Sequence, residues 1–272
     1  MRYLIIAAAG IGISLFAFSA SLRRTGKTLD VAAGSGEAHG PVVVELFTSE
    51  GCSSCPPADS LLRKIDEAHS VGNVPVIALE EHVDYWDDLG WQDPYSSHEW
   101  TVRQQRYADN FRQGSVYTPQ MVVDGRAEFV GSREGQARRT IEEMAGKEKA
   151  EVTVTEAKTG DGKDRVSVRV GKLPAGTGGD SPEVWLAITE TRLHTAVTRG
   201  ENAGEDLHHA AVVRTLRKLG TADAKNQENS FAGGADISLD KGWQRGNLRV
   251  VVFVQEKKSQ QIVGAAEVKI AQ

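Results

Sequence analysis

Residues Val42 to Asp59 read V-V-V-E-L-F-T-S-E-G-C-S-S-C-P-P-A-D, and this stretch decides the fold that we expect. Its first residues are apolar and largely β-branched, which predicts a buried strand. The segment 58–68 carries apolar side chains at helical spacing and predicts a helix. Cys52 and Cys55, the only two cysteines of the chain, therefore lie where a strand passes into a helix.

A C-x-x-C pair at such a junction is typical of thioredoxin-like redox proteins. The unpaired N–H groups and partial positive charge of a helix N-terminus stabilise a thiolate, so we predict an exposed and reactive Cys52. Cys55, one turn later, would close the disulfide. Pro56 and Pro57 donate no N–H, and we expect the remaining donors of the first turn to be free for the sulfur. A static disulfide and half of a metal site are the alternatives.

Composition limits the partners that we expect. The chain has 272 residues, of which 25% are charged, and a formal net charge of −5. It carries no basic stripe laced with aromatic side chains, so we predict no nucleic-acid partner. No cofactor is predicted. A chain of this length is expected to form two domains.

The first residues predict export. An apolar run follows Arg2 and ends in small residues, as in a secretory signal peptide. Arg23 and Arg24 beyond it are more typical of a retained anchor. We therefore predict a signal peptide or N-terminal anchor over residues 1–21, with membrane contact only if it is retained, and a flexible tether over 22–40. The folded part would lie in the periplasm or elsewhere outside the cytoplasm, where disulfides persist.

Residues 41–150 predict an α/β thioredoxin-like domain with the order strand, helix, strand, insertion, strand, strand, helix. The first two strands would be parallel, and Asp124-Gly125 would close a hairpin between the last two. A thioredoxin arrangement places a cis-proline where the third strand begins. Thr118 and Pro119 would then face the cysteines and bind the backbone of a substrate. A trans proline that opens an edge strand is the alternative.

The insertion, residues 82–111, is rich in aromatic side chains. Trp100, Tyr107 and Phe111 share one side of a helix that follows a capping box at 96–99. Arg103 and Arg106 are expected to face elsewhere. We interpret the aromatic stripe as core packing, because stripes at helical spacing usually face a core, and keep the wall of a substrate groove as the alternative.

Residues 151–272 differ from the first half in their sequence pattern. Short runs rich in β-branched residues alternate with Gly-rich turns, which predicts an all-β antiparallel sandwich-like domain. A polar patch in it contains Glu201, Asn202, His209 and Arg214. We interpret this patch as a hydrogen-bonded network that fixes a loop rather than as a binding site. The runs are 151–156, 165–170, 184–191, 212–219, 235–239, 248–255 and 262–270.

Several runs resemble a family of exported bacterial thioredoxin-like proteins known only as a domain of unknown function. These runs are E-L-F-T-S-E-G-C-S-S-C-P-P-A-D at 45–59, H-V-D-Y-W-D-D-L-G-W at 82–91, V-Y-T-P-Q-M-V-V-D-G at 116–125 and, later, R-G-E-N-A-G and V-F-V-Q-E. The family pattern has Asp-Asn after the histidine, where this chain has Ala210-Ala211 after His209. The resemblance implies a thioredoxin-like fold outside the cytoplasm and leaves the substrate open.

The leading functional hypothesis is a thiol–disulfide oxidoreductase. The Cys52 thiolate would attack a disulfide of a protein or small-molecule substrate, Cys55 would resolve the mixed disulfide, and an unknown redox partner would restore the pair. Glu45 or Glu50 would relay protons. One alternative is Cu(I) binding or delivery by Cys52 and Cys55, completed by His82 or Met121. Another is a non-catalytic binding module with an inert disulfide.

Overall fold

The computed structural model describes residues 39–159, 163–177 and 182–271. The predicted signal peptide or anchor and nearly all of the predicted tether lie outside these residues. Within them, no helix is both long and apolar enough to span a membrane. The described residues form one compact unit.

The first half follows the predicted order of strands and helices. β1 (Val42–Thr48) pairs in parallel with β3 (Val74–His82), and α1 (Pro56–Ala68) connects them. β4 (Gln120–Val123) pairs antiparallel with β1 and with β5 (Ala127–Val130), which confirms the predicted hairpin. The short elements in this half are β2 (Ser70–Val71) and the 3-10 turn η1 (Asp87–Leu89).

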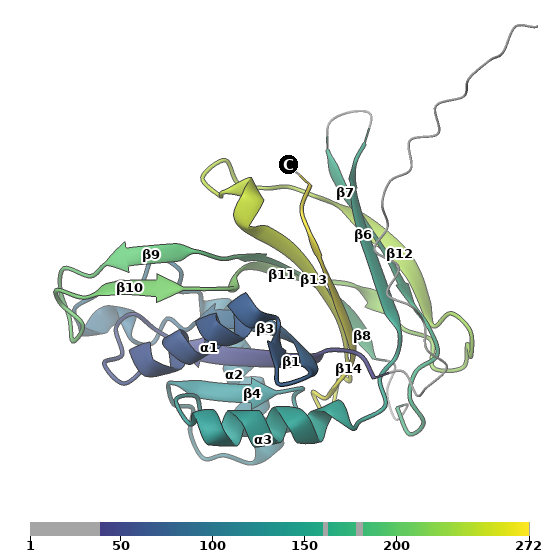
Figure 1. The fold of residues 1–272 in the computed structure, drawn as a ribbon, viewed down its shortest axis with the longest axis horizontal. Helices are drawn as coiled ribbons and strands as arrows, with labels where there is room; N and C mark the ends of the chain where they lie inside the picture. The colour runs from purple at the N-terminus through teal and green to yellow at the C-terminus, as the bar shows by residue number, and fades with distance from the viewer. Residues whose placement is uncertain (1–38, 160–162, 178–181, 272) are drawn as a thin grey trace, which may run out of the picture. The chain divides into compact units, whose positions relative to one another are not determined.

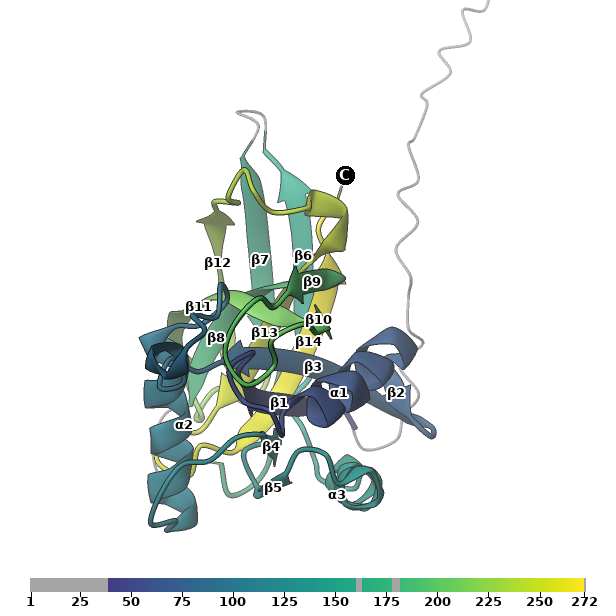
Figure 2. The same ribbon diagram turned by 90° about the vertical axis from the view of Figure 1, so that its left-hand side faces the viewer.

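Helices cover both faces of this part of the sheet. α1 and α3 (Glu134–Ala145) lie on one side and α2 (His98–Phe111) lies on the other (Figure 2). Side chains alternate along a strand, so β1 contributes to both cores. Its even-numbered residues, such as Leu46, pack with α1 and α3, whereas odd-numbered residues, such as Phe47, pack with α2.

The aromatic stripe of α2 packs into the core, as predicted. Trp100 and Tyr107 are buried, and the Tyr107 ring lies 6.0 Å from that of Phe47. Ser97 caps the helix by accepting a hydrogen bond from the backbone N–H of Glu99. Burial of these large rings supplies much of the hydrophobic stabilisation on this side of the sheet.

Arg103 of α2 is buried, contrary to the expectation that it faces away from the core. Its guanidinium Nε lies 2.6 Å from Glu45 Oε2 and 3.2 Å from Glu81 Oε1, both on neighbouring strands. Tyr107 donates its hydroxyl proton to Glu45 Oε1. The helical pattern did not predict burial of Arg103. Two acidic residues, far from α2 in the sequence, make burial of the cation tolerable.

The sheet continues past residue 150. Its order is β14-β13-β8-β11-β3-β1-β4-β5, and Val212 of β11 pairs in parallel with Glu80 of β3. The predicted boundary between domains at residue 150 is therefore no break in the sheet. The first half leaves one edge of β3 unpaired, and an unpaired strand edge is stabilised when another strand covers it. The added strands are β8 (Glu183–Glu190), β11 (Val212–Thr221), β13 (Leu248–Gln255) and β14 (Ile262–Lys269).

A second, three-stranded sheet has the order β12-β7-β6. Along β7 buried and exposed residues alternate strictly, and its buried valines pack against β8 and β13. The second half thus contains two packed β-layers, of which one is the end of the long sheet (Figure 1). The remaining elements here are β6 (Val152–Lys158), β7 (Asp164–Val170), β12 (Phe231–Ile237) and the 3-10 turn η2 (Arg245–Asn247).

A hairpin that the sequence did not predict lies beside α1. It consists of β9 (Leu193–Ala196) and β10 (Asp206–His209), and β10 packs along the helix (Figure 1). The loop between these strands holds Glu201 and Asn202 of the polar patch noted in the sequence, and His209 lies in β10. The hairpin therefore brings second-half residues to the cysteines.

Candidate functional site

Cys52 and Cys55 form a disulfide at the start of α1, with 5.4 Å between their Cα atoms. Cys55 is the N-cap residue, and Pro56 and Pro57 begin the helix. Both cysteines are 0% exposed, whereas Ser53 and Ser54 between them are exposed. The predicted exposure of Cys52 is therefore wrong, and the disulfide lies directly beneath the surface.

The loop between β9 and β10 covers the cysteine loop. Asn202 Nδ2 donates to the carbonyl oxygens of Glu50 at 2.8 Å and Cys52 at 3.1 Å. The backbone N–H of Ser53 donates to Glu201 Oε2 at 3.1 Å. For Glu201 and Asn202 the interpretation as a network that fixes a loop is confirmed, and the loop that they fix carries the cysteines. His209 lies instead in a buried cluster with Glu80, and Arg214 pairs with Glu190.

The N–H groups of the first helical turn are not free for the sulfur, contrary to our expectation. Those of Ala58 and Asp59 both donate to the carbonyl oxygen of Cys55, at 2.8 and 3.1 Å. The N–H of Cys55 donates to the carbonyl oxygen of Cys52 at 3.1 Å. A polar side chain near the sulfur is that of Ser54, whose Oγ lies 3.4 Å from Cys52 Sγ.

The Thr118–Pro119 peptide bond is cis and lies beside the first turn of α1. A Cβ built on Gly131 would lie 3.1 Å from Ala58 Cβ and 3.5 Å from Pro119 Cβ, so Gly131 lies close to both the proline and the first turn of the cysteine helix. Thr118 Oγ1 accepts a hydrogen bond from Trp86 Nε1 at 2.9 Å. The structure thus brings the two predicted substrate-binding residues to the cysteine end of the sheet.

The two predicted proton-relay residues lie in different places. Glu45 faces the α2 side with Arg103, because it lies at an odd-numbered position of β1, and it therefore points away from α1. Glu50 follows β1 and belongs to the buried polar cluster near the cysteine loop. Its Oε2 accepts from Trp91 Nε1 at 2.8 Å, and its Oε1 lies 3.1 Å from His209 Nε2.

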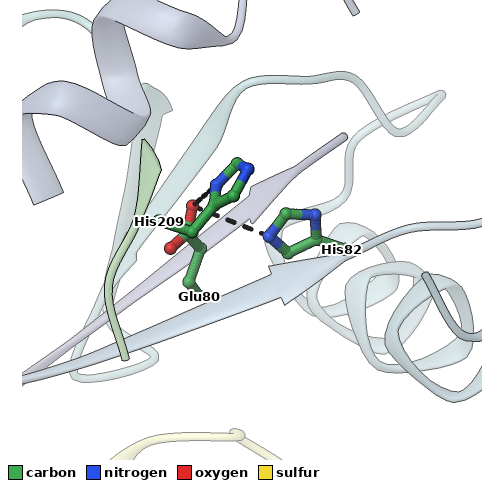
Figure 3. A group of neighbouring side chains, drawn as sticks. All are labelled: Glu80, His82 and His209. Atoms are coloured by element: carbon green, nitrogen blue, oxygen red, sulfur yellow. Dashed lines mark hydrogen bonds and ion pairs between the residues drawn. The ribbon is translucent and has the colours of Figure 1, made fainter. Parts of the chain in front are cut away.

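The buried cluster centres on Glu80, His82 and His209 (Figure 3). His209 Nδ1 lies 2.9 Å from Glu80 Oε1, and His82 Nδ1 lies 2.7 Å from Asp93 Oδ2. Burial lowers the pKa of His209, but the Glu80 charge and the hydrogen bonds that His209 donates to Glu50 and Glu80 outweigh it and raise the pKa to about 9. Burial likewise opposes ionisation of Glu80, yet His209 lowers the pKa of that carboxyl to about 2. The pair therefore carries opposite charges at neutral pH.

The structure does not gather the predicted copper ligands. Among the described residues, the cluster of possible metal ligands is Glu80, His82 and His209, and it includes neither cysteine. The His82 ring is held by Asp93 instead, and both sulfurs are joined in the disulfide. Met121, the other candidate, is buried in the core beneath α1 and α3.

Asp59 is a site residue that the sequence analysis missed. It lies four residues after Cys55, on the same side of α1, and accepts a hydrogen bond from Thr48 Oγ1 at 2.6 Å. Burial and, secondarily, repulsion from Glu80 raise the pKa of Asp59 to about 7. The available sign was an acidic residue within the apolar stripe of a helix that follows a C-x-x-C pair. A buried carboxyl that titrates near neutrality can exchange a proton during thiol chemistry.

The protein family described as "Protein of unknown function (DUF1223)" matches residues 43–255, a range that contains the cysteines, the cis-proline and His209. The chain belongs to this family. The predicted membership of a family known only as a domain of unknown function is thus confirmed. Among curated proteins, no match to this DUF1223 chain is found.

Solved structures resemble the DUF1223 chain over most of its length. A crystal structure of the Agrobacterium tumefaciens protein AGR_C_4864 is 26% identical, covers 87% of this chain and 97% of its own, and superposes with a TM-score of 0.66. HBP35 of Porphyromonas gingivalis is 16% identical, with coverage of 86% and 76% and a TM-score of 0.59. At 16% identity, the similarity to HBP35 shows a shared fold and nothing more.

The departure of this DUF1223 chain from the expected Asp-Asn pair leaves the cluster intact. Ala210 contributes its backbone N–H, which donates to Glu80 Oε2 at 2.8 Å and does not depend on the side chain. Ala211 adopts a φ of 55°, a left-handed conformation that asparagine tolerates better than alanine. Alanine at this position therefore carries a small backbone strain without loss of a hydrogen bond to the site.

Replacing Asp59 with asparagine is expected to stabilise the DUF1223 chain at pH 8 by roughly 2–4 kcal/mol. Asparagine retains an oxygen for Thr48 but cannot ionise. The folded-state pKa of Asp59 is raised from 3.8 to about 7. Its contribution to stability is therefore complete below pH 3.8 and is lost as the pH rises through about 7.

The measurement is denaturant unfolding of both proteins between pH 4 and pH 8. The advantage of Asp59→Asn should vanish towards pH 4. Asp109→Asn, an exposed change on α2, serves as the control and should leave the pH profile of the wild type unchanged. A constant difference between Asp59→Asn and wild type at all pH values would contradict the raised pKa.

Proposed function

We propose that this chain is an exported thiol–disulfide oxidoreductase with a thioredoxin-like first half, working outside the cytoplasm through Cys52 and Cys55. The supporting observation is a disulfide between residues three apart in sequence at the start of α1, the helix end near which Pro119 and the titratable Asp59 also lie. A disulfide that closes so short a loop restricts the unfolded chain little, so it contributes little as a structural link. The buried ionisable groups next to it cost stability, which favours a chemical role.

The exchange needs the two cysteines, two substrate thiols and a proton donor, and a separate redox partner must reoxidise the cysteines before the next turnover. A substrate thiolate attacks Cys52 Sγ, the Cys52–Cys55 bond breaks, and Cys55 leaves as a thiolate that takes a proton from Asp59. A second substrate thiolate then attacks the mixed disulfide, which releases an oxidised substrate and reduced Cys52. In the reverse direction the protein loses two electrons and reduces a substrate disulfide.

Access to the sulfur requires that the β9–β10 loop move. Asn202 and Glu201 hold it on the cysteine loop through three hydrogen bonds. Around Asn202, residues 199–201 and 203–205 are exposed, and Gly200 and Gly204 adopt positive φ values of 78° and 95°. The loop therefore has few apolar contacts to break, and local opening of such segments costs little free energy.

Asn202→Ala is expected to accelerate reduction of the disulfide by dithiothreitol about tenfold. The loss of two hydrogen bonds to backbone carbonyls costs the closed loop about 1–2 kcal/mol, which raises the open population by that factor. Asn226→Ala, in an exposed loop elsewhere, is the matched control and should react at the wild-type rate. The measurement is the rate of thiol appearance in the folded protein.

The catalytic hypothesis is tested in the same series with a scrambled disulfide substrate. Wild type should reshuffle it, Asn202→Ala should do so faster, and Cys52→Ala should lose the activity. Equal rates for wild type and Cys52→Ala would refute the proposal. A disulfide in the folded wild type that dithiothreitol and glutathione leave intact would instead favour the binding module with an inert disulfide.

A further inference from the structure

We propose that Glu80, His82 and His209 form a binding site for a zinc-type divalent cation. This site is separate from the cysteines and does not rest on the proposed redox function. The ligand atoms are one carboxylate oxygen and one ring nitrogen from each histidine, and all lie within 4.8 Å of one another. In Figure 3 both imidazole rings approach the Glu80 carboxylate from the same region.

One ring nitrogen in this cluster finds no hydrogen-bond partner among the residues that the structure describes. His82 is 0% exposed and engages Asp93 through Nδ1 at 2.7 Å. Its Nε2 is an orphaned buried atom that lies 3.7 Å from Glu80 Oε1, beyond hydrogen-bond distance. Buried polar atoms are nearly always satisfied, so an orphan aimed into a group of ligands indicates a missing partner. A cation at this position would accept the Nε2 lone pair.

In each of the three ligand residues, the nitrogen or oxygen atom that would not bind the metal has a hydrogen-bond partner. Asp93 holds Nδ1 of His82, and Glu50 Oε1 lies 3.1 Å from Nε2 of His209. The backbone N–H of Ala210 donates to Glu80 Oε2 at 2.8 Å. Histidines that bind metals almost always have the second ring nitrogen fixed by a carboxylate or a carbonyl, and ligating carboxylates are hydrogen-bonded in turn. The cluster has this outer layer at each ligand.

The chemistry of the donors selects the metal. Two imidazole nitrogens and one carboxylate oxygen form the ligand set of three-residue zinc sites, whereas calcium and magnesium prefer oxygen ligands. Bonds of about 2.0–2.1 Å in tetrahedral geometry place ligand atoms about 3.3 Å apart. Glu80 Oε1 lies 2.9 Å from His209 Nδ1 and 3.7 Å from His82 Nε2, which bracket that spacing. The ring nitrogens of the two histidines lie within 4.8 Å of each other, so rotation of the side chains would have to bring them closer to complete the geometry.

Charge around the cluster also favours a cation. Four buried carboxylates surround the two histidines: those of Glu50, Asp59, Glu80 and Asp93. A dication at this position would take the place of the protons on the two imidazole rings, and the surrounding carboxylates would remain as its counter-charges.

Entry of the ion is expected to be slow. All three ligand residues are buried, but a surface cavity of ≈ 340 Å³ has His209 and Ala210 in its lining. It gives a path from solvent to one side of the cluster. Binding should therefore equilibrate over long incubation or during refolding rather than on mixing.

The test is zinc binding by the full mature chain with its disulfide intact, so that the cysteines cannot act as ligands. A second group could bind zinc at the surface: His194 and His208 are exposed and stack at 5.7 Å with Asp206 between them. The test is therefore carried out in a His194→Ala/His208→Ala background. After refolding with zinc and dialysis against a weak competing chelator, metal analysis should give one zinc per chain.

His82→Gln and Glu80→Gln should each lower zinc affinity by about 100-fold or more. His98→Gln, which changes an exposed histidine paired with Asp84, is the matched control and should bind as the background does. Zinc should also raise the Tm of the background chain, a readout that remains if the variants fold poorly. A cobalt(II) form should show the visible absorption of a nitrogen- and oxygen-ligated low-symmetry site.

Two outcomes would overturn the proposal. The first is a background chain that, after refolding with zinc, holds no zinc and shows no change in Tm. The second is zinc bound with unchanged affinity in both His82→Gln and Glu80→Gln. Neither outcome bears on disulfide exchange, because the cysteines remain oxidised throughout.

Discussion

Replacing Arg103 with methionine is expected to destabilise the folded chain by about 3–5 kcal/mol at pH 7, because it leaves carboxylates buried without their cation. Arg103 is 4% exposed and lies within ion-pair distance of Glu45 and Glu81, which are 0% and 1% exposed. Burial and then the charge of Glu45 already raise the pKa of Glu81, and Arg103 opposes both effects. Methionine fills much of the volume but supplies no charge.

The measurement is denaturant unfolding of wild type and variant at pH 7. Arg106→Met lies on the exposed side of the same helix and provides the control. It should change the free energy of unfolding by less than about 0.5 kcal/mol. A loss below about 1 kcal/mol for Arg103→Met would show that the three charges do not depend on one another.

Gly125→Ala is expected to cost more than about 3 kcal/mol, because it combines backbone strain with a clash against another backbone segment. Gly125 adopts a φ of 62°, and a Cβ placed there would lie 2.0 Å from the carbonyl oxygen of Gln260. Rotation of a side chain cannot relieve this contact. The adjacent carbonyl of Asp124 accepts a hydrogen bond from the N–H of Ile262 at 2.8 Å, so the turn is fixed to the start of β14.

Alanine variants of two other glycines serve as controls that separate backbone strain from the steric clash at Gly125. Gly176 adopts a φ of 86° with nothing within 4 Å of its Cβ position, so alanine there reports strain alone, about 1–2 kcal/mol. Gly114 has open space and no positive φ, and alanine should be nearly neutral. If Gly125→Ala cost no more than Gly176→Ala, the segment at Gln260 would have to move aside freely.

Local patterns predicted the elements but not how the two halves join. Helical spacing and runs of β-branched residues located β1, α1 and most later strands within a few residues. The pairing of Val212 with Glu80 connects residues far apart in sequence. The same run of residues would form a strand in a separate sandwich or in the shared sheet, so its partner was not encoded locally.

The same holds for the candidate site: residues in short motifs could be predicted, whereas residues that depend on tertiary contacts could not. The C-x-x-C pair and the cis-proline belong to short motifs and were found. The strand β3 continues through Glu80, Glu81 and His82, three residues that in sequence look like surface residues. They are buried because alternation sends Glu80 and His82 towards His209, and Glu81 towards Arg103. Their burial depends on His209 and Arg103, which belong to other elements, and the sequence of β3 alone does not predict these contacts.

The pairing of β11 with β3 has a practical consequence for handling this protein. A fragment that stops near residue 150 would present an unprotected β3 edge to neighbouring molecules, and bare edges of this kind promote aggregation. It would also lack the loop that lies over the sulfurs. Any recombinant piece made for assays or crystallisation should therefore extend through the last strand of the long sheet.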